Sequence, residues 1–345
     1  MNIFIEGNIS QALEFLKDST ESDVYFVLPD SAKGMRKKKL EEDLEFLKTQ
    51  VTITSLLERK YVKDYIKEYD HYFGWNSFDE NVEYKDLKTH PQNRLFDEYD
   101  FESIETFTPF KKQAEKLLPK RYENNIFQEQ DNEVLDCLSY YFEKTHLAQT
   151  YFETRNGVIG RDYSTKFSRF LSNGRLNVRY LYNYLKEYEE KYGSNKSTYW
   201  IQFEILWREF FYWSYQKNKT SFFSLNGLKG KREFKRDYSS NLLSYLKGDE
   251  FMECVLKELF ETGFISNRFR QVFASEWIHK YKFDWRDGAY LFECYLADYD
   301  VYSNWGNWQY LAGVGHDPRG KRRFNVLKQL DTYDPKREYL KKWKT

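Results

Sequence analysis

The chain has 345 residues, and its 54 basic and 54 acidic side chains give a formal net charge of zero. This length exceeds what one hydrophobic core usually organises, so two domains are expected. The charge balance excludes a globally basic nucleic-acid-binding protein, and any surface for a polyanion must therefore be local.

Cysteine and histidine usage narrows the class of protein. Cys137, Cys254 and Cys294 are widely spaced and too few for a four-cysteine cluster, which is typical of a reducing compartment. The five histidines show no ligand spacing, so no metal site is expected. No apolar run approaches the roughly 20 residues of a membrane span, and the first residues lack a secretory pattern. We therefore expect a soluble, cytoplasmic protein with no membrane partner.

The first fifty residues alternate short β-like runs with amphipathic helical patterns: NIFIEG, ISQALEFLKD, DVYFVL, RKKKLEEDLEFLKT and VTITSL. This order predicts a small parallel α/β domain over residues 1–59. Residues 60–136 are charged, aromatic and irregular, with Pro91, Pro109 and Pro119 as breakers, which predicts a connector with some helix.

Residues 137–345 carry helical periodicity in several segments that are separated by Gly, Ser and Asn. We predict a helical domain over this range. The fold class is therefore mostly α, with a small parallel α/β domain in front of the helices.

One predicted helix, in TYWIQFEILWREFFYW, carries charge among aromatic residues. At about 100° per residue, Glu204 and Arg208 fall on one side, close to Trp207. An ordinary surface pair at i,i+4, worth about 0.3 to 0.5 kcal/mol, is one explanation. Because the helix is apolar almost all round, we expect it to be buried, and a buried carboxylate favours a functional site.

The segment GRDYSTKFSRFLSNG places the hydroxyls of Ser164, Thr165 and Ser168 beside Lys166, just before a helix. Hydroxyls and helix N-terminal amides together can hold a phosphate group. An ordinary N-cap explains one such hydroxyl equally well.

Two further segments contain oppositely charged side chains that could form ion pairs. TGFISNRFRQ supplies Arg268 and Arg270 after a glycine turn, and LADYDVYSNWGNW supplies Asp298 and Asp300. Arginine pairs well with carboxylates and phosphates. Turn and capping chemistry is the alternative explanation for the two aspartates.

Five segments together resemble the flavin-binding half of the photolyase and cryptochrome family, above all the DASH-type cryptochromes: ETRNGVIGRDYSTKFSRFLSNG, STYWIQFEILWREFF, TGFISNRFRQ, DWRDGAYLFECYLADYDVYSNWGNWQYLAGVGHDPR and YDPKREYLKKW. The resemblance runs continuously from about Gln149 to Trp343. It implies a helical domain that holds non-covalent FAD as its chromophore.

The resemblance also implies roles for single residues. Those that would line FAD are Tyr151, Ser164, Thr165, Phe167, Ser168, Arg208, Arg270, Asp298, Asp300 and Asn304. Glu204 and Trp207 match the residues that hydrogen-bond to and stack on a flipped-out pyrimidine dimer. The matches to the strip that faces the lesion and the DNA backbone are Asn267, Arg268 and Gln271.

For electron transfer to FAD, the resemblance assigns Trp308 to the flavin-proximal position and Trp285 to the middle position. The distal position is held by Phe234, which is far harder to oxidise than Trp. Candidate substitutes are Tyr238, Trp277 and Tyr281.

The first part of the chain departs from the family. IFIEGNISQALEFL resembles the family's third strand and helix, so the opening strands are expected to be absent and the α/β domain shortened. We therefore expect no folate or deazaflavin antenna, and a partner chain could complete the α/β half. Arg169 replaces a proline of the family pattern, and His316 replaces an asparagine.

The function predicted from the resemblance is light-driven, FAD-dependent repair of cyclobutane pyrimidine dimers in DNA, with single-stranded DNA preferred. Two alternatives stay open: a blue-light sensor or interaction module without repair activity, and a degenerate scaffold or redox flavoprotein. Glu204 and Trp207 favour repair, whereas the zero net charge, the missing strands and Phe234 favour the alternatives.

Overall fold

The computed structural model describes residues 2–5, 12, 16, 23–29, 32–58, 71–73, 88–90, 93–97, 105–123, 131–229, 242–317 and 322–344. The chain divides into two compact units. The first comprises Met1–Glu98, Leu118–His146 and Phe167–Ser194, and the second comprises Tyr99–Leu117, Leu147–Lys166 and Asn195–Thr345. The domain boundaries predicted after residues 59 and 136 stay a prediction.

The first unit contains a five-stranded parallel sheet in the order β3-β2-β1-β4-β5. Two strands lie within the predicted β-like runs, β1 (Asn2–Ile5) and β2 (Asp23–Leu28), whereas β3 (Ser55–Glu58) overlaps only the last two residues of VTITSL. The other two, β4 (His71–Phe73) and β5 (Lys88–His90), come from the predicted connector. Strands of three residues are too short to show an alternating pattern, so sequence periodicity missed them.

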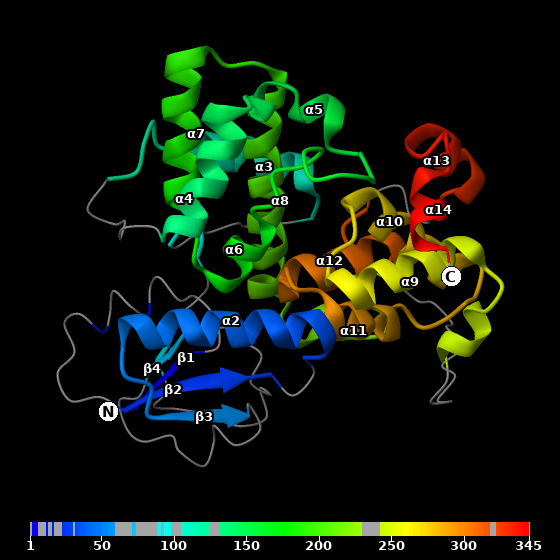
Figure 1. The fold of residues 1–345 in the computed structure, drawn as a ribbon, viewed down its shortest axis with the longest axis horizontal. Helices are drawn as coiled ribbons and strands as arrows, with labels where there is room; N and C mark the ends of the chain where they lie inside the picture. The colour runs from blue at the N-terminus through cyan, green and yellow to red at the C-terminus, as the bar shows by residue number, and fades with distance from the viewer. Residues whose placement is uncertain are drawn as a thin grey trace. The chain divides into compact units, whose positions relative to one another are not determined.

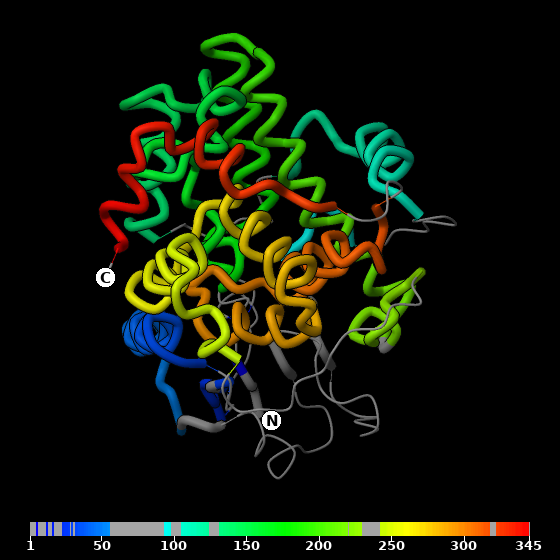
Figure 2. Tube along the Cα trace, turned by 90° about the vertical axis from the view of Figure 1, so that its right-hand side faces the viewer, coloured from blue at the N-terminus to red at the C-terminus, as the bar shows by residue number. Residues whose placement is uncertain are grey.

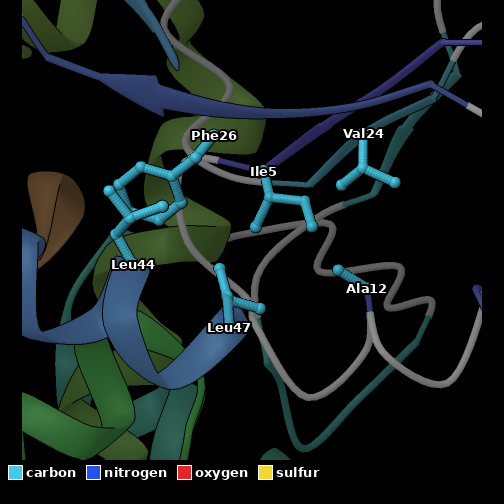
Figure 3. Close-up of a cluster of buried hydrophobic side chains, with 6 residues drawn as sticks. All are labelled: Ile5, Ala12, Val24, Phe26, Leu44 and Leu47. Carbon is cyan, nitrogen blue, oxygen red and sulfur yellow. The ribbon is translucent and has the colours of Figure 1, made fainter. Parts of the chain in front are cut away.

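The sheet packs on α2 (Gly34–Gln50), which covers the helix predicted from RKKKLEEDLEFLKT. Val24 and Phe26 are two residues apart on β2 and therefore share a face. Figure 3 shows them clustered with residues from β1 and α2, and the buried members of this cluster are Ile5, Ala12, Val24, Phe26, Leu44 and Leu47. Apart from residues 12 and 16, the helix predicted from ISQALEFLKD lies outside the described residues.

Besides α2, the described residues of the first unit form α4 (Asn132–Ser139), the π-helix η3 (Tyr140–Lys144), α6 (Ser168–Asn173) and α7 (Val178–Tyr192). Asp43 of α2 is 3% exposed and accepts hydrogen bonds from Arg169 at 3.2 Å and Asn173 at 3.0 Å. Burial nevertheless raises the pKa of Asp43. Arg169, which departs from the family pattern, thus ties α6 to α2.

The second unit is helical. Its α-helices are α3 (Phe107–Leu117), α5 (Tyr151–Thr154), α8 (Lys196–Asn218), α9 (Glu250–Thr262), α10 (Asn267–His279), α11 (Trp285–Tyr295), α12 (Val301–Ala312), α13 (Val326–Tyr333) and α14 (Glu338–Trp343). Single 3-10 turns lie at Leu147–Gln149, Lys219–Phe223 and Leu242–Leu246. Figure 2 shows α9 to α12, coloured yellow to orange, packed against one another.

Helix α8, labelled in Figure 1, is the long helix of this unit and contacts α3, α5 and α12. It begins with a capping box in which Asn195 and Thr198 bond to each other's backbone. Most of its residues are buried, as its nearly continuous apolar sequence predicted. His316 lies against it, hydrogen-bonded to Ser214 and, at 2.8 Å, to the Glu105 carbonyl.

Two glycines let α12 approach its neighbours closely. A Cβ atom at Gly306 of α12 would overlap the Phe211 ring of α8, and one at Gly288 of α11 would overlap the Trp308 ring. Only glycine allows backbone contact of this kind. The position of α12, which carries several candidate site residues, is therefore set by packing.

The predicted fold class, mostly helical with a parallel α/β part in front, is confirmed. Within the part of the chain that the structure describes, no helix combines the length and the apolar character needed to cross a membrane.

Candidate functional site

The N-terminus of α12 carries a buried carboxylate. Asp300 is the N-cap residue, and its Oδ1 accepts a hydrogen bond from the Ser303 backbone N–H at 2.8 Å. Its Oδ2 lies 3.4 Å from Nε of Arg208 on α8. Capping and the positive end of the helix dipole both stabilise a negative charge at this point. The ion pair fixes α8 and α12 around one carboxylate.

A second carboxylate, Asp298, lies two residues earlier and is also 8% exposed. The Arg270 Nη2 group donates to both of its oxygens at 2.9 Å, and Arg270 Nε donates to the Ile265 carbonyl at 2.8 Å. The guanidinium also lies 5.2 Å from the centre of the Phe264 ring. Charge, hydrogen bonds and ring contact together immobilise Arg270.

The hydroxyl-rich segment holds its lysine in an uncommon backbone conformation. Lys166 has a φ of 59°, in the left-handed region that non-glycine residues rarely adopt. Its Nζ lies 3.8 Å from the centre of the Tyr163 ring and 3.9 Å from that of Phe264. Burial, reinforced by the positive charge of Arg270, lowers the pKa of Lys166 to about 8. Two cations that repel each other thus share the Phe264 ring, an arrangement that a bound anion would stabilise.

Asn304 lies one turn into α12 and is buried. Its Nδ2 donates to the Ala289 carbonyl of α11 at 2.9 Å, which fixes the amide plane. Trp308 follows four residues later and therefore shares a helix face with Asn304. It is 2% exposed.

Glu204 of α8 is held by a residue that the sequence did not connect with it. Arg155, the C-cap of α5, donates from Nη1 to Glu204 Oε1 and lies 5.2 Å from the centre of the Trp200 ring. Burial raises the pKa of Glu204, although Arg155 opposes the shift. Because Arg208 pairs with Asp300 instead, the alternative of an i,i+4 surface pair between Glu204 and Arg208 is wrong.

Trp207, one turn further along α8, is half-buried and has an aromatic partner on one face. The Phe107 ring of α3 stacks on the indole, with ring centres 3.7 Å apart and planes 7° from parallel. Tyr310 of α12 meets the indole edge-on at 5.9 Å. Phe211 also contacts the indole, at 5.5 Å and a tilt of 35°. A ligand that stacks on Trp207 therefore cannot use the face that Phe107 covers.

Residues Asn267, Arg268 and Gln271 occupy the first turns of α10. Arg268 donates to Gln271 Oε1 at 3.2 Å and to Asn156 Oδ1 at 3.0 Å. Burial lowers the pKa of Arg268, and the charges of Arg155 and Arg322 add to this effect. Arg155 is paired with Glu204, and Arg322 with Asp317 at 3.3 Å. Arg268 donates to amide oxygens instead, so it is the member of this group best suited to a phosphate.

The remaining residues assigned to FAD lie in two places. Tyr151, at the start of α5, is 9% exposed, and burial together with the charge of Glu204 raises its pKa. Phe167 and Ser168 belong to the first unit, where Phe167 packs on Tyr141 and Ser168 begins α6.

The two tryptophans assigned to electron transfer have different neighbours. Trp285 is fully buried, donates to the Leu225 carbonyl at 3.0 Å and contacts Trp305 at 5.6 Å. Trp308 contacts Trp277 at 6.3 Å and Phe292 at 5.2 Å. Within the described ranges there is no ring contact between Trp285 and Trp308. Phe234 and Tyr238 lie outside the described residues.

The chemistry of these residues fits FAD at several points. Lys166 and Arg270 suit a phosphate anion, and the hydroxyls of Ser164 and Thr165 lie directly before Lys166 in the chain. Buried carboxylates at Asp298 and Asp300 can accept hydrogen bonds from sugar hydroxyls or ring N–H groups. By contrast, residues 2–58, 71–73, 88–97, 105–229, 242–317 and 322–344, as far as they are described, contain no cluster of His, Cys, Asp or Glu arranged to hold a metal ion.

Sequence reasoning missed Arg155 and Phe107 as neighbours of Glu204 and Trp207. Arg155 is 49 residues from Glu204, and Phe107 lies in the segment interpreted as a connector. No periodic pattern links positions so far apart. Arg155 does stand in ETRNG, a segment that resembles the family, but the resemblance implies no role for this arginine.

Comparison with known proteins connects this geometry to a family. Residues 200–344 match the sequence model of the FAD binding domain of DNA photolyase. The chain is 40% identical over 288 residues to a DASH cryptochrome of Idiomarina loihiensis, covering 73% of this chain and 64% of that protein. It is 45% identical over 210 residues to a DASH cryptochrome of Vibrio parahaemolyticus, covering 60% of this chain and 47% of that protein.

A solved structure agrees with these matches. A cryptochrome of Synechocystis superposes with a TM-score of 0.80 at 27% identity, over 99% of this chain and 88% of that one. The chain belongs to the photolyase and cryptochrome family. It spans 64% and 47% of the length of these two DASH relatives, so what a complete family member does is a proposal for this chain.

Proposed function

We propose that this chain binds FAD non-covalently and uses it, under light, to repair cyclobutane pyrimidine dimers in DNA, preferring single strands. The observation that carries the proposal is the pair formed by Glu204 and Trp207 on α8. The Glu204 carboxylate is one-third exposed, lies one turn from the Trp207 indole and is paired with Arg155, so a ligand could use it as a polar anchor beside a stacking surface.

FAD would be held at two groups of residues. Arg270 and Lys166, with the hydroxyls of Ser164 and Thr165, would bind the phosphates, and Phe167 and Ser168 continue that segment. Asp298, Asp300, Arg208 and Asn304 would hold the ribose, adenine and ring system, and Tyr151 completes the proposed set.

When bound, reduced and photo-excited, FAD would supply one electron to the dimer and receive it back after the ring splits. The chain's own residues prepare that reaction. Glu204 would accept hydrogen bonds from a base edge once Arg155 moves or shares it. Trp207 would stack on the flipped dimer with the ring face that Phe107 does not cover. Asn267, Arg268 and Gln271, with Arg322, would contact the DNA backbone and so keep the lesion oriented.

The decisive experiment follows dimer loss under blue light in single-stranded DNA with reduced, FAD-loaded protein. Wild type should restore monomers, and Glu204→Gln should retain FAD but repair much more slowly. Absence of repair by wild type at every flavin redox state would reject the enzyme and leave a flavoprotein without repair activity. Equal rates for wild type and Glu204→Gln would keep the enzyme and reject this account of its site.

A blue-light sensor without repair activity is the second candidate, and two contacts favour it. Glu204 is already paired with Arg155, and one face of Trp207 is already covered by Phe107. Both groups that would receive a lesion thus have internal partners. In that case light should change the flavin redox state and the protein conformation, while dimers stay intact.

Two accompanying expectations stay predictions: that no antenna chromophore binds, and that another chain could complete the α/β half.

A further inference from the structure

Trp277 of α10 is a buried tryptophan for which neither FAD binding nor lesion binding gives a role. It is 1% exposed, and its Nε1 donates to the Asp284 carbonyl at 2.9 Å, which fixes the indole plane. Its ring lies 6.3 Å from that of Trp308, at 81°, and 5.1 Å from that of Phe283. Trp277 is therefore in direct contact with Trp308, which shares a face of α12 with Asn304.

The aromatic contacts continue from Trp277 toward solvent. Phe283 stacks on Tyr281, with ring centres 5.6 Å apart and planes 24° from parallel. Tyr281 is half-buried, and its hydroxyl donates to Asp249 Oδ2 at 2.7 Å. Lys280, which is exposed, donates to the same oxygen at 2.6 Å. The path that begins at buried Trp308 thus ends at a phenol beside a carboxylate near the surface.

Asp249 is suited to receive the phenolic proton. Although burial opposes it, the hydrogen bonds from Lys280 and Tyr281 hold the pKa of Asp249 below its ordinary value. The carboxylate is therefore ionised and already hydrogen-bonded to the group that would lose a proton. A tyrosine can give up an electron readily only if its proton has an acceptor at hand.

Trp285 offers a less continuous path within the described residues. Its ring contact is with Trp305, whose Nε1 donates to Glu293 at 3.3 Å and to the Tyr299 hydroxyl at 3.2 Å. Trp308, by comparison, contacts Trp277 and Phe292. The chain of rings that includes Trp308 therefore runs through α10.

We propose that Trp277 and Tyr281 form a one-electron path from the surface to Trp308. The proposal rests on the proposed function, because the electron acceptor is photo-excited oxidised flavin. Trp308 gives it one electron, Trp277 refills Trp308, and Tyr281 refills Trp277 across the Phe283 ring. The Tyr281 proton passes to the Asp249 carboxylate as the phenol is oxidised. A thiolate in solution then gives one electron to the tyrosyl radical and becomes a thiyl radical, while Asp249 returns the proton to the phenolate.

Two substitutions interrupt the path with little change of shape. Trp277→Phe removes the oxidisable indole, and Tyr281→Phe removes the hydroxyl but keeps the stack on Phe283. Trp343→Phe, in α14, is the control for loss of a tryptophan elsewhere, and Trp285→Phe tests the competing route. FAD occupancy and thermal unfolding of each protein are measured first, and all four variants should hold FAD as wild type does.

The main readout is the radical trapped by freezing FAD-loaded protein under blue light, identified by electron paramagnetic resonance. Wild type should show a tyrosyl signal that narrows when the protein contains ring-deuterated tyrosine. The signal should disappear in Tyr281→Phe and in Trp277→Phe and persist in Trp343→Phe. Flavin photoreduction with dithiothreitol should be lost in parallel. The proposal is overturned if the tyrosyl signal survives in Tyr281→Phe. It is also overturned if the signal is lost in Trp285→Phe but persists in Trp277→Phe, because the electron would then travel through Trp285.

A flavin-free measurement separates this proposal from the function on which it rests. Laser photoionisation of tryptophan in protein without FAD produces indole radicals, whose conversion into tyrosyl radicals is followed by transient absorption. Tyr281→Phe and Trp277→Phe should each lower the yield of tyrosyl radical. In Trp343→Phe, the yield that arises at Tyr281 should be unchanged. If wild type takes up no FAD, the proposed function fails while this measurement still decides the path. Equal conversion in wild type and Tyr281→Phe rejects the path even where FAD binds.

Discussion

Replacing Lys166 by Met should change how FAD affinity depends on pH. In the free protein, burial and the charge of Arg270 lower the pKa of Lys166 from 10.5 to about 8. Since a change of one unit in a pKa corresponds to about 1.4 kcal/mol, the charged amine costs the fold at most about 3.5 kcal/mol. Solvent screening of this half-buried group makes the actual cost smaller. A phosphate group beside the amine would remove that cost.

The direction of the effect follows from the protons bound in each state. Between pH 8 and 10.5 the free folded protein binds fewer protons at Lys166 than the unfolded chain, so its stability should rise with pH over this window, and the cost is fully present below pH 8. FAD binding restores the proton. Its affinity should therefore be constant below about pH 8 and should weaken above it, by up to about tenfold per pH unit.

The assay is titration of FAD into flavin-free protein at several pH values, with quenching of flavin fluorescence as the signal. Lys166→Met should bind FAD more weakly at neutral pH and should lose the slope above pH 8. Lys247→Met, at an exposed lysine of the same unit, is the matched control and should keep the wild-type profile. An identical slope in Lys166→Met, or a flat wild-type profile, would refute the reasoning.

Four further predictions test other parts of the site. Asp300→Asn keeps an N-cap side chain but removes the charge paired with buried Arg208, so it should lower both FAD affinity and thermal stability. Asn325→Ala, the control, should cost about 1 kcal/mol of stability and leave FAD bound. Glu204→Gln should retain FAD and reduce repair by roughly tenfold to a hundredfold, measured as dimer loss, if it weakens a charge-assisted hydrogen bond worth about 1.5 to 3 kcal/mol. Phe107→Leu removes the stack on Trp207 and should weaken dimer binding by about 0.5 to 1.5 kcal/mol in a DNA titration, without change in FAD occupancy. The action spectrum of photoreduction should follow flavin absorption alone; a maximum away from it, or stoichiometric folate in the purified protein, would contradict the expected lack of an antenna.

The sequence by itself determined the elements that depend on local pattern. The apolar run DVYFVL marks β2, and the helical patterns mark α2 and α8, because side-chain periodicity and capping residues act over a few positions. The family was also legible, since its motifs are contiguous segments in a fixed order, and the matches to the DASH cryptochromes confirm it.

Only the tertiary structure decided which groups face each other. Arg270 meets Asp298 across 28 residues, Arg155 meets Glu204 across 49, and the Phe107 ring stacks on Trp207 from a segment that resembled a connector. The short strands β4 and β5 likewise exist because they pair with the sheet. Such contacts depend on where packing places whole helices, as when Gly306 admits the Phe211 ring between α12 and α8, and no local pattern carries that information.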